Sequence, residues 1–166
     1  MYCNSDADGT PWKTVYDLRE ELAARPEMAA AAQRLTLDPR KPLFGLLGAH
    51  GLFGSEEWWE SIRTGKIRTE VVRGTIVELC FEGQESRWGD EVNTFRMQLA
   101  DGSEFQEAIY GRLEEDRRLF RVGATVCVAY ARDAWKRPAA DGTTDHAWVL
   151  LEMAVSRRTG SGRPST

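Results

Sequence analysis

Five segments between Val71 and Val155 have the composition of β-strands, and a charged segment with helical character interrupts them in the third gap. The strand candidates are residues 71–81, 93–100, 104–110, 124–131 and 147–155, and the helical segment is residues 112–120. This order of elements predicts a mainly β, α+β protein. We expect a five-stranded antiparallel OB-like barrel over residues 67–156, with one helix between strands 3 and 4 and an SH3-like barrel as the alternative.

The second and third strand candidates carry the clearest signal. Phe95, Met97 and Leu99 alternate with polar residues, so that one face of the second strand is apolar. Asp101 and Gly102 follow directly and predict a two-residue type I′ hairpin into the third strand.

The N-terminal region, residues 1–66, reads as helical, and we expect it to pack on the barrel. Thr10 and Pro11 predict the start of a first helix, and Pro26 ends it and opens a second that runs to Leu35. Ser55 caps a third helix over residues 56–63. The last ten residues, 157–166, contain three arginines, no acidic residue and no large apolar side chain, which predicts a flexible basic tail.

Glycine stands at every third position in one loop, at Gly45, Gly48, Gly51 and Gly54. Such a loop before a helix can bind phosphate through its backbone N–H groups. Here Ser55, Glu56 and Glu57 follow, where a nucleotide-binding loop would carry a lysine. A tight loop packed against the barrel is therefore the favoured interpretation, and the role of the loop stays open.

Composition restricts the class of protein. The chain has 166 residues and a net charge of −4, with no apolar run near the roughly 20 residues of a membrane helix and no secretory signal. Three cysteines, Cys3, Cys80 and Cys127, cannot all pair, and two of them lie in apolar strand patterns. These features predict a cytoplasmic protein.

Two long loops of the expected barrel carry a tryptophan beside basic side chains. The first spans residues 82–92 and the second residues 133–146. In an OB-like barrel, loops of this kind flank the ligand-binding face. The candidate contacts in and between these loops are Arg87, Trp88, Trp135, Lys136, Arg137 and, on the second strand, Arg96. One of Trp58 and Trp59 is a further candidate, because adjacent helical residues point about 100° apart and one narrow stripe cannot bury both.

Tryptophan next to basic residues is typical of single-stranded nucleic-acid binding, but acidic residues are interleaved in the same loops. Mixed charge around tryptophan favours a protein partner. The sequence contains no metal-binding spacing and no nucleophile motif, so we expect no enzyme, no cofactor and no metal. A site built from Cys80 or Cys127 with His146 is the least favoured alternative. We therefore predict a non-catalytic binding protein, an inhibitor, neutraliser or adaptor, of open oligomeric state, with nucleic-acid binding as the second hypothesis.

Overall fold

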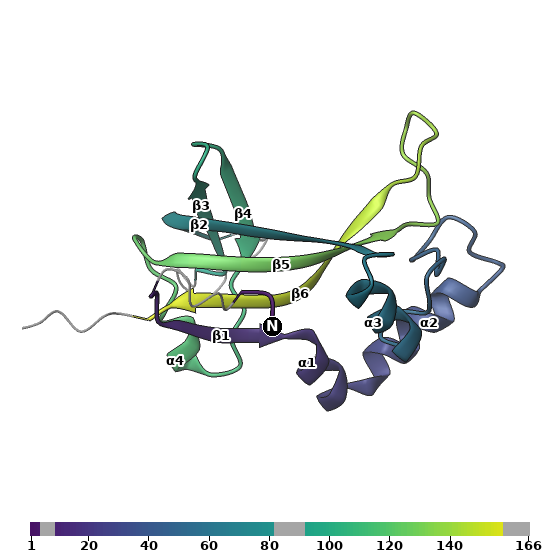
Figure 1. Ribbon diagram of the computed structural model, residues 1–166, viewed down its shortest axis with the longest axis horizontal. Helices are drawn as coiled ribbons and strands as arrows, with labels where there is room; N and C mark the ends of the chain where they lie inside the picture. The colour runs from purple at the N-terminus through teal and green to yellow at the C-terminus, as the bar shows by residue number, and fades with distance from the viewer. Residues whose placement is uncertain (4–8, 82–91, 158–166) are drawn as a thin grey trace, which may run out of the picture. The chain divides into compact units, whose positions relative to one another are not determined.

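The computed structural model describes residues 1–3, 9–81 and 92–157, and Figure 1 labels its elements. The protein is mainly β, as predicted. Its strands are β1 (Trp12–Asp17), β2 (Arg68–Cys80), β3 (Thr94–Leu99), β4 (Glu104–Ala108), β5 (Thr125–Ala134) and β6 (His146–Ser156). Its helices are α1 (Leu18–Ala24), α2 (Pro26–Leu37), α3 (Glu56–Arg63) and α4 (Glu114–Arg117).

All five predicted strands form, and α4 lies within the predicted helical segment 112–120. The strands make one antiparallel sheet in the order β1-β6-β5-β2-β3-β4, which is open in the part of the chain that the structure describes. A closed five-stranded barrel would require β6 and β4 to pair. The extra strand β1 pairs with β6 instead, so the OB-like barrel is not confirmed.

The segment after Pro11 is a strand, and the prediction of a helix from Thr10 was wrong. Trp12, Val15 and Tyr16 have spacings that fit a helix, but aromatic and β-branched side chains also favour strands. The helix begins only at Leu18, where the side chain of Asp17 accepts a hydrogen bond from the Glu20 N–H at 3.1 Å. The predicted helices at Pro26 and after Ser55 are present as α2 and α3.

The hairpin between β3 and β4 forms in the predicted place, but its turn is not of type I′. A type I′ turn needs positive φ at both central residues, and no residue other than glycine has one in the described part of the chain. The Gly102 N–H donates to the Leu99 carbonyl at 3.0 Å, and the Leu99 N–H donates to the Ser103 carbonyl at 2.8 Å. This three-residue loop ends on Gly102, at φ 84°, as a type I turn with a G1 bulge does.

The chain divides into two compact units. Unit 1 comprises Met1–Tyr16, Val71–Val128 and Glu152–Thr166, and unit 2 comprises Asp17–Glu70 and Ala129–Leu151. Fully buried side chains of unit 1 include Phe95, Met97 and Val126. The core of unit 2 is centred on Trp58, which is fully buried.

Candidate functional site

Most of the predicted contact residues that the structure describes lie in unit 2, and the two tryptophans of α3 have different surroundings there. Trp58 is 0% exposed, and its indole N–H donates to the carboxylate of Asp133 at 2.9 Å. Trp59 is half-buried, with the Arg19 guanidinium 3.9 Å from the centroid of its ring. Of this pair, Trp59 is therefore the one with surface left for a partner.

Lys136 holds three segments of unit 2 together. Its ammonium donates to the carbonyls of Leu35 at 2.6 Å and Lys41 at 3.1 Å, and a weaker bond reaches Asp38 at 3.4 Å. The carbonyls at the end of α2 have no partner within the helix, and a cation is favoured there by the helix dipole. The charge of Lys136 thus stabilises the end of α2, while Arg137 beside it is exposed to solvent.

Trp135 is paired with a second segment. It faces Leu46 across an isolated antiparallel bridge, flanked by hydrogen bonds from the Leu47 N–H to the Ala134 carbonyl at 2.8 Å and from the Lys136 N–H to the Gly45 carbonyl at 3.0 Å. Residues that face each other across such a bridge have their side chains on one side. Residues 45–47 are therefore held against residues 134–136 by backbone hydrogen bonds.

Large apolar side chains remain exposed around this bridge. Phe44 is 64% exposed and Trp135 is 39% exposed, although both belong to well-bonded segments. The other exposed apolar residues of the same region are Leu37, Leu43 and Leu47. We call this set, together with the basic residues Arg34, Arg40, Lys41 and Arg137, the Phe44–Trp135 surface.

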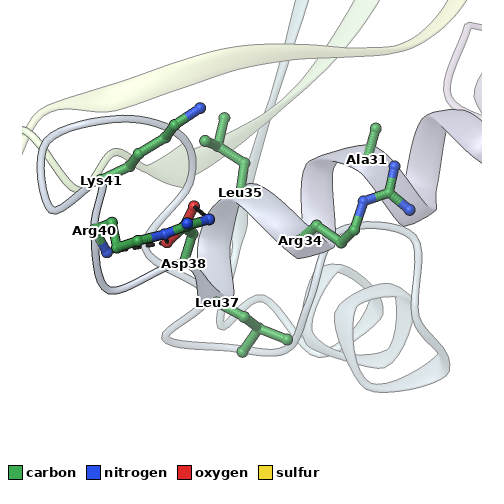
Figure 2. Close-up of a pocket in the computed structure, with 7 residues that line it drawn as sticks. All are labelled: Ala31, Arg34, Leu35, Leu37, Asp38, Arg40 and Lys41. Atoms are coloured by element: carbon green, nitrogen blue, oxygen red, sulfur yellow. Dashed lines mark hydrogen bonds and ion pairs between the residues drawn. The ribbon is translucent and has the colours of Figure 1, made fainter.

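A groove of about 620 Å³ lies at the end of α2, beside the Leu35 and Lys41 carbonyls that the Lys136 ammonium contacts. It is lined by Ala31, Arg34, Leu35, Leu37, Asp38, Arg40 and Lys41. Figure 2 shows the Arg40 side chain folded against Asp38, with Lys41 and Leu37 on either side of the pair. The hydrogen bonds from Arg40 hold the pKa of the Asp38 carboxyl below its usual range, so this carboxylate stays ionised and paired.

The glycine-rich loop, residues 45–54, packs closely against α2 and α3. This packing explains the role of the loop, which the sequence alone left open. Each of its four glycines has positive φ. A Cβ at Gly45 would come within 2.8 Å of the Leu35 side chain, and one at Gly51 within 2.7 Å of the Trp58 backbone nitrogen. Only glycine lets the loop approach α2 and α3 so closely, and the loop therefore has a packing role.

The remaining predicted contacts fall elsewhere. Arg87 and Trp88 lie outside the described residues. Arg96 is on β3 in unit 1, between the carboxylates of Glu78 on β2 and Glu104 on β4, the latter at 3.1 Å. These two ion pairs link the three strands, and a partner contact at Arg96 stays a prediction.

A buried pair of thiols in unit 1 includes Cys127, one of the two cysteines of the least favoured alternative. The hydrogen bond from Cys3 and the nearby Arg73 lower the pKa of the Cys127 thiol. Cys3 and Cys127 are both fully buried, and Cys3 is hydrogen bonded to Cys127. The Cys3 N–H donates to the buried carboxylate of Glu152 at 3.0 Å. The bond to Cys127 and the burial raise the pKa of the Cys3 thiol far above its usual range, so this thiol stays protonated and is a poor nucleophile.

Sequence reasoning missed Leu37, Leu43 and Phe44. The available signal was an apolar run, Leu43-Phe44 and Leu46-Leu47, directly after the Asp38-to-Pro42 turn. Such a run looks like ordinary core, and only the folded chain shows that three of its members, Leu43, Phe44 and Leu47, stay in solvent.

Comparison with known families places the chain beside immunity proteins. A family model described as immunity protein RhsI2 matches residues 12–156 of the chain. No curated protein matches it. In the described part of the chain, every helix is too short or too polar to span a bilayer.

Proposed function

Because the chain belongs to the RhsI2 immunity protein family, we propose that it protects a cell by binding a protein toxin and inhibiting it. The family match over residues 12–156 is the observation that carries this proposal. Membership implies a protein partner and an inhibitory role, in agreement with the binding class that the sequence predicted. We propose that the inhibition is stoichiometric rather than catalytic.

We further propose that the toxin contacts exposed aromatic and basic side chains. Trp135 and Arg137 are the described residues that best support this assignment, with Trp59 as a secondary contact. Tryptophan and arginine are over-represented among the residues that dominate interface energies. Arg87 and Trp88 remain proposed contacts on the basis of the sequence alone.

We propose that the protein acts in the cytoplasm. The three cysteines are free, and free thiols persist best in a reducing compartment. Fractionation of the source cells followed by immunoblotting tests this location. Recovery in the membrane or extracellular fraction would contradict it.

The main test is protection against the toxin that RhsI2 immunity proteins neutralise. Cells expressing that toxin from an inducible promoter are grown with and without this chain, and the two purified proteins are titrated by calorimetry. We expect restored growth and a 1:1 complex, with protection only when the chain is at least equimolar to the toxin. Toxicity that persists at excess chain, with no heat of binding, would overturn the proposed function. Full protection far below equimolar amounts would overturn the non-catalytic mechanism.

A further inference from the structure

We propose that the Phe44–Trp135 surface is the toxin-binding site and that it accepts an acidic, partly apolar face of the toxin. This inference rests on the proposed function and specifies its partner.

The first argument is apolar exposure. Phe44, Leu37 and Trp135 are 64%, 66% and 39% exposed, and Leu43 and Leu47 add to them within a short stretch of chain. Single exposed apolar residues are common, but several in one local structure are typical of an interaction site. An aromatic side chain that leaves water on binding contributes strongly to affinity, so Phe44 and Trp135 are the expected anchors.

The second argument is that this surface is preorganised. Residues 45–47 are hydrogen bonded to residues 134–136, and the Lys136 ammonium bridges α2 and the turn that follows it. Gly45 packs against the Leu35 side chain. The turn after α2 is held by the hydrogen bonds between Arg40 and Asp38. An ordered surface loses little conformational entropy on association. The apolar side chains are therefore displayed by a fixed scaffold.

The third argument is charge. The chain carries −4 overall, yet this surface holds Arg34, Arg40, Lys41 and Arg137. Arg34 and Arg137 have no ion pair with any described residue, whereas Asp38 is already paired with Arg40. Of the nearby acidic side chains in the β5–β6 loop, Asp141 accepts from Thr143 and Asp145 accepts from the His146 N–H. These neutral donors leave the charges of Asp141 and Asp145 in place, but residues 34–47 and 135–145 together hold five basic side chains against three acidic ones. The net charge of this surface is therefore positive, and its electrostatic complement is an acidic partner.

A protein fits this surface better than a nucleic acid does. Phosphate binding would use the arginines, but three exposed leucines offer no stacking face to a base. They do offer contact area to apolar side chains at the centre of a protein interface.

The experiment compares variants of the full chain for affinity to the purified toxin. Phe44→Ala/Trp135→Ala removes the two anchors, and Leu113→Ala/Val122→Ala is its control, because both control residues are exposed apolar side chains in unit 1. Arg34→Glu and Arg137→Glu reverse the unpaired charges, and Lys66→Glu is their control at an exposed site of unit 2. Circular dichroism and melting temperature check that each variant is folded.

We expect the anchor variant to weaken binding by about thirty-fold or more, since an interface hot spot contributes at least about 2 kcal/mol. The charge reversals should weaken it by about ten-fold, mainly through a slower association rate that depends on salt. Carbene footprinting of the wild-type complex should protect Phe44 and Trp135. The control variants should bind as the wild type does.

The outcomes separate the two proposals. If the wild type binds the toxin and the anchor and charge variants bind equally well, the toxin uses another surface and this inference is wrong, while the proposed function stands. If the wild type does not bind or protect, the proposed function fails and this inference fails with it. If the wild type carried bound nucleic acid, and the anchor variant lost that nucleic acid but kept its affinity for the toxin, the inference would also be wrong.

Discussion

Two tryptophans that are neighbours in the sequence, Trp58 and Trp59, serve different purposes because successive helical residues point in different directions. Trp58 lies in the core of unit 2 and satisfies the buried Asp133 carboxylate. Trp59 stays half-exposed under the Arg19 guanidinium. Burying Asp133 is tolerable only because hydrogen bonds from Trp58 and from the Ala134 N–H replace those of water.

Replacing Trp58 by Phe should therefore destabilise the protein. The substitution removes the indole N–H and leaves one oxygen of Asp133 buried without that donor, at a cost of about 1–3 kcal/mol. The matched control is Trp59→Phe, which makes the same chemical change at a half-buried site. Urea unfolding monitored by circular dichroism measures both. Equal losses for the two variants would mean that the bond to Asp133 is not what stabilises the core.

The thiols should react at very different rates. Cys80 is half-buried, whereas Cys3 and Cys127 are fully buried, and the raised pKa keeps the Cys3 thiol protonated. Iodoacetamide at pH 8 should alkylate Cys80 in the native protein and should reach Cys3 and Cys127 only in denaturant. Peptide mass spectrometry gives the site of labelling. Labelling of Cys3 in the native protein as fast as Cys80 would contradict the burial of the Cys3 thiol.

At the scale of elements, Lys136 and Arg137 show how adjacent cations can divide structural and binding roles. Lys136 bonds to carbonyls at and after the end of α2, a helix that has no buried residue of its own. A helix with so little burial depends on its ends and on contacts with neighbours. Arg137 makes no comparable bond among the described residues, so its guanidinium is available to bind a partner protein.

Replacing each of these cations by Met should separate the two roles. Lys136→Met removes charge-assisted hydrogen bonds and should lower the free energy of unfolding by about 1.5–3 kcal/mol. Arg137→Met should leave stability unchanged and weaken toxin binding. Urea unfolding and calorimetry with the toxin measure the two effects. A stable Lys136→Met variant, or a destabilised Arg137→Met variant, would refute this division.

At the scale of the whole molecule, the first forty residues contribute to both units. Cys3 and Val15 are buried in unit 1, where β1 forms an edge of the sheet, and Leu18 is buried in unit 2. Leu35 and Thr36 of α2 lie against Gly45 and Gly48 in unit 2. Residues 1–40 therefore contribute side chains to the core of each unit.

Deletion of residues 1–40 should abolish cooperative unfolding or make the protein insoluble, because it exposes apolar surface in both units. The control is deletion of residues 158–166, which contain no large apolar side chain and should leave the melting temperature unchanged. Differential scanning calorimetry compares the two. An unchanged melting temperature after the N-terminal deletion would show that residues 1–40 form a separate arm.

The sequence alone determined the five strands from β2 to β6, the β3–β4 hairpin, the starts of α2 and α3, and the binding class. These features depend on local rules: period-two alternation, turn residues, capping residues and the absence of catalytic motifs. It also predicts Trp135 and Arg137 as partner contacts, because a tryptophan beside basic residues in a long loop is visible in one segment of chain, and this assignment stays a prediction.

Only the tertiary structure decided the role of residues 12–17, the open sheet and the exposed Phe44. Trp12 to Tyr16 fit a helix or a strand by local pattern, and pairing of β1 with β6, far away in the sequence, selected the strand. Lys136 and Leu35 are 101 residues apart, so no local pattern could show that this lysine belongs to the end of α2. Long-range hydrogen bonds and burial are properties of the folded chain, and they decide which apolar and charged side chains remain for a partner.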